Sequence, residues 1–225
     1  MSMISPSNLD SLAPKKLGHF RESNNLGTLA DIYLDDTNIV VWKRELNNKI
    51  LNAANHIIDS NTSLELLQIV TPQDTYSHLE KLLGSTKMAR ILCKDIESLV
   101  DIFCNLFNLK QVGLRLAVLD RAMCPRFHVD GVPCRLVTTY QGVATEWLPH
   151  HSADRSKLGM GNQGKPDEES GLFQNAADTQ QLSQGDIALL KGEGWAGNEG
   201  AGLIHRSPSL DLNSRRLLLT IDFVD

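Results

Sequence analysis

The chain has 225 residues, a length that fits one large domain or one domain with a helical appendage. Hydrophobic residues make up 41% and charged residues 22%, which is globular composition and excludes a disordered chain. The formal net charge of -5 excludes a basic nucleic-acid or membrane binder, so we expect no nucleic-acid partner, and no run of about 18 apolar residues predicts a membrane-spanning helix.

The four cysteines form no C-x-x-C pair, and the first residues lack the apolar core of a signal peptide. We therefore expect reduced thiols and a cytoplasmic protein.

The first half of the sequence predicts helices with few strands. Residues 1–30 are polar, contain two prolines and predict a loosely ordered arm. Residues 31–110 predict a mainly helical region, in which apolar spacing, β-branched runs and helix start signals indicate these elements: a strand at 38–42, a helix over 46–58, a strand at 63–70, and helices over 72–83 and 86–108.

The second half, residues 111–225, predicts short strands. About seven of them are separated by turns: 112–120, 125–130, 134–142, 142–149, 184–192, 202–206 and 215–224. Such a series is typical of a sandwich, jelly roll or barrel. The polar, glycine-containing segment 152–183 is too long for a tight turn, so we expect it to cover a site or to move.

Three residues form a candidate metal site. The stretch CPRFHVDG, residues 124–131, holds His128 and Asp130, which point to the same side if the stretch is a strand. His205, in GLIHRSP, offers the third ligand from a distant strand. Two histidines and a carboxylate on one face of a metal leave coordination positions open, as in the non-haem Fe(II) oxygenases.

Two neighbouring arginines follow His205 at the start of the last strand. With Arg215 and Arg216, the order H-x-D, H, R resembles the 2-oxoglutarate-dependent oxygenase superfamily over residues 112–224. This resemblance implies a double-stranded β-helix core (jelly-roll or cupin-like), an α+β fold in which the helical N-terminal half packs against that core, and Fe(II) and 2-oxoglutarate as cofactors. It also implies that one arginine binds the far carboxylate of 2-oxoglutarate, since a guanidinium binds carboxylate bidentately.

The pattern leaves open which arginine faces the site. Arg215 shares its side of the strand with Leu217 and Leu219, which looks more like a core face, whereas Arg216 shares its side with Leu218 and Thr220. The Ser or Thr that often follows the superfamily arginine by two residues is replaced by leucine.

More closely, CPRFHVDGVPCRLVTTYQGVATEWLP and the later HRSP and RRLLLTIDF resemble a bacterial family, domain-of-unknown-function family 1826, over most of the chain. That family has no established reaction and is loosely associated with zinc-responsive genes.

Other functions stay open. Zn(II) could occupy the His-Asp-His site of a non-catalytic metal-binding protein, and Cys124 or Cys134 could supply a soft ligand, although Cys124 is about 13 Å from His128 along an extended strand. Alternatively, His128 and Asp130 only form hydrogen bonds in a β-sandwich. His150 and His151 are expected in a solvent-exposed loop. An oxygenase would take a small-molecule or protein substrate, and neither its identity nor the oligomeric state follows from the sequence.

Overall fold

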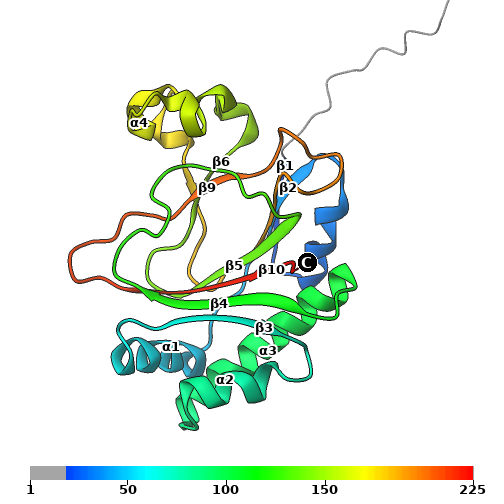
Figure 1. Ribbon diagram of the computed structural model, residues 1–225, viewed down its shortest axis with the longest axis vertical. Coiled ribbons are helices and arrows are strands. Elements are labelled where there is room, and N and C mark those ends of the chain that lie inside the picture. The colour runs from blue at the N-terminus through cyan, green and yellow to red at the C-terminus, as the bar shows by residue number, and fades with distance from the viewer. Residues whose placement is uncertain (1–18, 225) are drawn as a thin grey trace, which may run out of the picture.

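A computed structural model describes residues 19–224 of the chain (Figure 1). Its strands and helices occur in this order: β1 (His19–Ser23), the 3-10 helix η1 (Leu26–Tyr33), β2 (Thr37–Trp42), α1 (Asn48–Ser60), β3 (Glu65–Val70), α2 (Thr75–Leu83), α3 (Lys87–Phe107), β4 (Val112–Leu119), β5 (Cys134–Gln141), β6 (Glu146–Leu148), α4 (Asp167–Ser170), β7 (Gln180–Gln181), β8 (Ile187–Lys191), β9 (Ile204–Arg206) and β10 (Arg216–Asp222). Four further short 3-10 turns fall between residues 150 and 178. The expected α+β class is confirmed.

The largest element is a mixed seven-stranded sheet in the order β1-β2-β8-β5-β10-β4-β3. The pair β1 and β2 is parallel and the other pairs are antiparallel. Strands β2 and β3, from the region expected to be mainly helical, lie in the same sheet as the strands after residue 111. Residues 1–18 of the expected arm lie outside the described residues, and the rest of that arm includes β1 and the start of η1.

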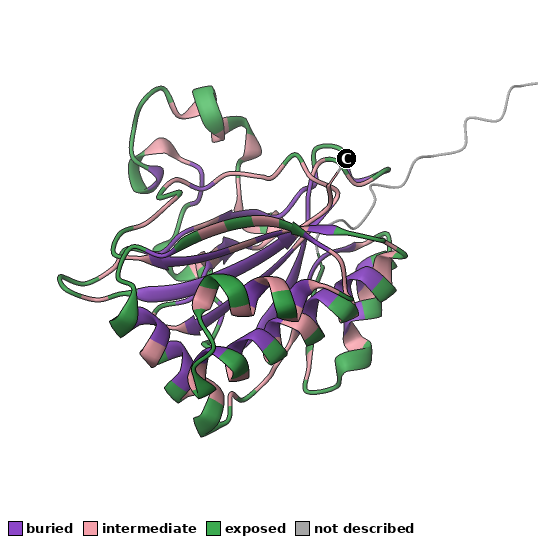
Figure 2. Cartoon of the chain, turned by 60° about the horizontal axis from the view of Figure 1, so that its bottom comes forward, coloured by how far each residue is buried: buried purple, intermediate pink, exposed green. Residues whose placement is uncertain are grey.

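Two layers cover the two faces of this sheet. Helices α1, α2 and α3 pack on one face, and their buried stripes face the strands in Figure 2. A three-stranded sheet, in the order β7-β6-β9, packs over part of the other face. Both faces of the central strands are therefore apolar.

Strand β10 shows how the two cores are divided. Leu217 and Leu219 belong to the core under the helices, and Leu218 belongs to the core between the two sheets. Since alternate residues of a strand point to opposite faces, Arg216 lies on the Leu218 side, between the sheets. In the described part of the chain, no helix is long and apolar enough to cross a membrane.

One predicted strand is wrong. Residues 125–130 are not a strand, because only His128 makes a bridge, to His205. Pro125 begins the stretch and Pro133 follows it. Proline has no backbone N–H group to donate, so neither residue can extend a ladder of strand hydrogen bonds. Within this stretch, strand-like backbone pairing is present only at His128.

Candidate metal centre

Backbone pairing brings the two predicted histidine ligands together. The amide of His128 donates to the carbonyl of His205 at 3.0 Å, and the amide of His205 donates to the carbonyl of His128 at 2.9 Å. Residues that exchange both hydrogen bonds in an antiparallel bridge carry their side chains on the same side. The two imidazole rings accordingly lie with their centroids 4.6 Å apart.

The hydrogen bonds of the two rings determine which nitrogen atoms are available. Nδ1 of His128 lies 2.9 Å from the carbonyl of Arg126, and Nδ1 of His205 lies 3.1 Å from the carbonyl of Leu203. A carbonyl only accepts, so Nδ1 carries the proton in both neutral rings and Nε2 keeps its lone pair. Metal-binding histidines in proteins are commonly held in this way.

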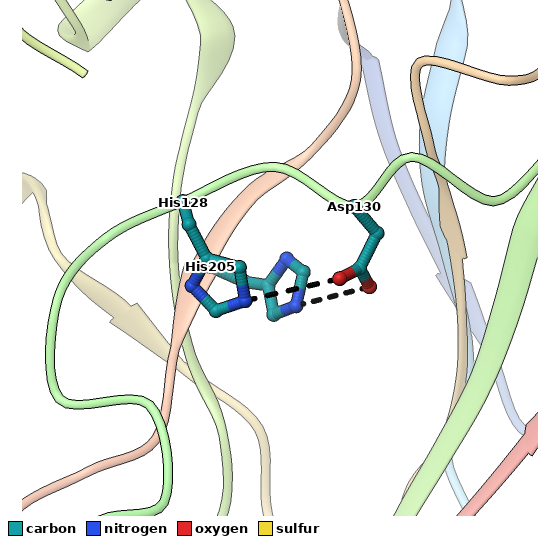
Figure 3. A group of neighbouring side chains, drawn as sticks. All are labelled: His128, Asp130 and His205. Atoms are coloured by element: carbon teal, nitrogen blue, oxygen red, sulfur yellow. Dashed lines mark ion pairs between the residues drawn. The ribbon is translucent and has the colours of Figure 1, made fainter. Parts of the chain in front are cut away.

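Asp130 completes the cluster. Its Oδ1 lies 3.8 Å from Nε2 of His128, and its Oδ2 lies 3.4 Å from Nε2 of His205 (Figure 3). The three potential ligand atoms lie within 4.8 Å of one another. The predicted residues thus converge, and His128, at 34% side-chain exposure, is the member that is most open to solvent.

Burial favours the neutral form of the His205 ring. The His205 side chain is 8% exposed, and this burial lowers its pKa to about 4, although the nearby Asp130 carboxylate opposes the shift. The ring is therefore neutral at neutral pH, which is the form that binds a metal.

Neither cysteine that could have supplied a zinc ligand joins the cluster. Cys124 is exposed, and its backbone pairs with Ser207 on the chain after β9. Cys134 is fully buried in the helix-side core, and burial raises the pKa of its thiol well above the usual value. Among the described residues, the only metal-compatible group of three consists of His128, Asp130 and His205.

The two candidate arginines lie in opposite environments. Arg215 is exposed, whereas Arg216 has 0% exposure and lies between the sheets. Nη2 of Arg216 donates to the hydroxyls of Thr139 and Thr145, at 3.2 and 3.3 Å, but Nε and Nη1 have no hydrogen-bond partner among the described residues. Burial lowers the pKa of Arg216 to about 10, so the guanidinium remains charged at neutral pH.

A small cavity connects the histidines with the surroundings of Arg216. Its volume is about 40 Å³, and His128, His205, Leu218 and Thr145, a hydrogen-bond partner of Arg216, line it. This is room for about one or two water molecules, so a larger ligand has to displace lining side chains such as Met123.

A larger groove adjoins the cavity where the small sheet leaves the big sheet uncovered. It has a volume of about 410 Å³ and shares Met123, Arg135 and Thr220 with the cavity. Its walls include Leu67 and Ile69 of β3, which are 64% and 60% exposed.

The lining of the small cavity includes no residue of the polar segment 152–183. Leu172 and Phe173 of this segment pack with Phe127, Leu148 and Ile204, whereas its Leu182 belongs to the core between the sheets. The part of the segment that contains α4 projects beyond the small sheet in Figure 1, whereas the end of the segment forms strand β7 of that sheet. His150 and His151, directly before this segment, are partly buried and exposed, respectively, and lie outside the group of His128, Asp130 and His205.

Sequence reasoning missed three charged residues at the site. Arg135 donates to Asp130, Asp222 holds Arg135, and Asp167 accepts from the amide of Phe127 beside His128. A charged residue inside an apolar strand, as in CRLV or LTIDF, was the available signal for the first two. For Asp167, which is 39 residues beyond His128, the sequence carried no signal.

The fold and site define a class: a mixed α+β protein with a three-residue candidate metal centre beside a buried arginine. A sequence model of one family, described as a protein of unknown function (DUF1826), matches residues 23–222, so the chain belongs to this family. The resemblance expected from the sequence is confirmed. No curated protein matches the chain.

Solved structures resemble the chain only distantly. A Pseudomonas putida prolyl-4-hydroxylase has 10% identity and a TM-score of 0.47 over 88% of this chain and 97% of its own. An iron-bound HygX from Streptomyces hygroscopicus has 11% identity and a TM-score of 0.48, with 87% and 84% covered. A dioxygenase for auxin oxidation from Arabidopsis thaliana, bound to 2-oxoglutarate, has 8% identity and a TM-score of 0.45, with 80% and 73% covered. TM-scores below 0.5 carry no weight for the function of this chain.

Proposed function

We propose that this chain is an Fe(II)- and 2-oxoglutarate-dependent oxygenase that hydroxylates or demethylates a small-molecule or protein substrate in the cytoplasm. His128, Asp130 and His205 would hold the metal. The two facing sheets support a double-stranded β-helix, jelly-roll architecture for the strands after residue 111. Bound Fe(II) would supply the activation of dioxygen that this chemistry needs, while 2-oxoglutarate supplies two electrons and leaves as succinate and carbon dioxide.

The observation that carries the proposal is the buried, incompletely paired guanidinium of Arg216. A buried cation without an anionic partner is costly, so its retention is explained by an anion that binds there. Its Nε and Nη1 have no partner among the described residues and remain as donors for such an anion. Thr139 and Thr145 hold the guanidinium in place through Nη2.

Apolar residues of the cavity would exclude water from the site, and the adjoining groove would admit the substrate. Leu218, Val137 and Leu190 form apolar walls, which strengthen charge pairing with Arg216. The adjoining groove with Leu67 and Ile69 supplies the open approach for the substrate. We propose this route in place of one under the 152–183 segment.

An anaerobic titration tests the function. Metal-free protein receives Fe(II) and then 2-oxoglutarate, and a charge-transfer absorption band is expected from the ternary complex. Arg216→Gln should raise the Kd for 2-oxoglutarate by about 100-fold or more, the loss that follows when a buried charge pair is removed. Arg215→Gln, the matched control on the exposed neighbour, should leave this Kd unchanged. Succinate release that survives Asp130→Ala would contradict the proposal.

A second candidate function is non-catalytic zinc binding in metal homeostasis. The small cavity favours it, because two histidines, one aspartate and a single water complete a tetrahedral zinc site without a co-substrate. This function predicts tight Zn(II) binding, no charge-transfer band and no consumption of 2-oxoglutarate. The same titration, with metal analysis of protein purified without added metal, separates the two functions.

A further inference from the structure

Arg135 links a candidate metal ligand to a second carboxylate. Its Nη1 donates to Oδ2 of Asp130 at 2.7 Å. Its Nε and Nη2 donate to the two oxygens of Asp222, at 2.7 and 3.0 Å. The three side chains are 14 to 25% exposed, so water screens these contacts only in part.

The backbone explains why the three meet. Arg135 and Asp222 are opposite one another in the register of β5 and β10, while Asp130 lies in the connection between β4 and β5, shortly before β5 begins. The carbonyl of Asp130 also accepts from the amide of Glu193, which fixes this connection at its ligand-bearing end. Both the donor and the acceptor of the Arg135–Asp130 bond are therefore held by neighbouring structure.

The bidentate pair with Asp222 fixes the plane of the guanidinium. A planar fork held at two nitrogens leaves the remaining N–H groups in set directions. One of these directions ends at Oδ2 of Asp130, so rotation of this carboxylate would break the bond.

The charges favour a positioning role over simple competition with the metal. A lone guanidinium beside Asp130 would repel a divalent cation. The carboxylate of Asp222 offsets this repulsion. Two carboxylates and one guanidinium together carry a net charge of -1, so the group still attracts a cation. Arg135 can thus hold one oxygen while the carboxylate keeps its affinity for metal.

We propose that Arg135, clamped by Asp222, is a positioning residue that makes Asp130 bind the metal through one oxygen only. This inference rests on the metal site of the proposed function and assigns a role to two residues outside it. Binding through one oxygen keeps a coordination position free for an exchangeable ligand, which a catalytic site needs and a closed structural site does not.

Co(II) binding to the full-length chain tests the role without any need for activity. Co(II) is titrated into metal-free protein, the Kd is obtained by competition with a chelator, and the visible d–d spectrum is recorded at saturation. Arg135→Gln and Asp222→Asn are each expected to weaken Co(II) binding about 10- to 100-fold, the range for residues that support a metal ligand. The d–d spectrum should change, because the coordination by Asp130 changes.

Two variants separate the explanations. Arg135→Lys keeps the charge but loses the bidentate geometry, so we expect it to bind Co(II) as weakly as Arg135→Gln. Wild-type affinity in this variant would mean that charge alone matters and would overturn the proposal. Arg115→Gln is the matched control, since Arg115 pairs with Glu65 beside the same groove without contacting Asp130, and it should bind like the wild type.

The remaining outcomes are equally clear. Co(II) binding by Arg135→Gln that equals or exceeds that of the wild type, in protein with unchanged circular dichroism, overturns the positioning role and leaves the metal site intact. If the wild-type chain binds no Co(II), the proposed function fails and this inference with it. Asp222→Asn, which is nearly isosteric, provides the second measurement if Arg135→Gln does not fold.

Discussion

Arg216 has an unusual environment for an arginine. It is among the largest fully buried side chains, and its Nε and Nη1 have no hydrogen-bond partner among the described residues. Each unsatisfied buried donor costs about 1–3 kcal/mol. The ligand-free protein therefore carries a local energetic penalty at the place where we propose that an anion binds.

Replacing this arginine with a residue of similar shape should stabilise the ligand-free protein. Arg216→Met removes the buried charge and keeps most of the volume, so we expect the free energy of unfolding to rise by about 1–2 kcal/mol. Chemical denaturation of both proteins measures the difference. A loss of stability would show that the bonds to Thr139 and Thr145 outweigh the cost of burial.

The low pKa of His205 predicts a dependence of stability on pH. Its pKa is about 4 in the folded protein and about 6.5 in an unfolded chain, so the unfolded state takes up the proton first. The free energy of unfolding of the metal-free protein should thus fall as the pH drops from about 6.5 to about 4, by about 3 kcal/mol in all.

Denaturation at several pH values, compared with His205→Gln, isolates this contribution. The variant should have a smaller slope in this pH range. Equal slopes would mean that His205 does not titrate as described.

At the same scale, the sequence predicted the three cluster residues but not the environment of the arginines. Spacing indicated that His128 and Asp130 face the same way, and the residue order suggested His205. The sequence favoured the Arg215 side of β10 as the core face. That side is apolar because helices cover it, whereas Leu218 on the other side is covered by the small sheet. With apolar residues on both faces, the pattern of one strand cannot distinguish them.

Among the elements, helix α4 links the segment 152–183 to the stretch 125–130 that carries His128. Asp167 is buried and accepts from the amide of Phe127 at 2.7 Å and from Nε of Arg126 at 2.9 Å. The carbonyl of Arg126 in turn accepts from the ring of His128. One carboxylate of α4 thus supports the backbone that orients a candidate ligand.

Removing this carboxylate should destabilise the protein. Asp167→Ala leaves Arg126 and Arg206 without their shared partner, and we expect it to lower the free energy of unfolding by about 3 kcal/mol. Glu169→Ala, an exposed position on the same helix, should change it by less than about 0.5 kcal/mol. Urea denaturation compares them, and equal effects would contradict the anchoring role.

The helices were well predicted from the sequence, and the loop elements were not. Regular apolar spacing located α1 and α3 to within a few residues. In contrast, α2 begins at Thr75 rather than at 72, because the side chain of Asp74 accepts from the amide of Thr71 and forms a turn before the helix. The stretch 125–130 alternates like a strand, but its position depends on β9 and on Asp167, which are distant in the sequence.

For the whole molecule, metal binding should appear as an increase in thermal stability. A ligand at 100 times its Kd stabilises the folded state by about 2.7 kcal/mol, which corresponds to about 5–10 °C in Tm for a chain of this size. Differential scanning calorimetry with Co(II) or Zn(II) measures this shift. Asp130→Ala should show none, and Cys124→Ser should show the full shift, since Cys124 lies outside the cluster.

The bridge between His128 and His205 also determines when the site can exist during synthesis. Ribosomes extend the chain from its N-terminus, so His128 and Asp130 emerge long before β9 can pair with them. The three side chains of the candidate site therefore come together only after residues near the end of the chain have paired with the stretch that carries His128.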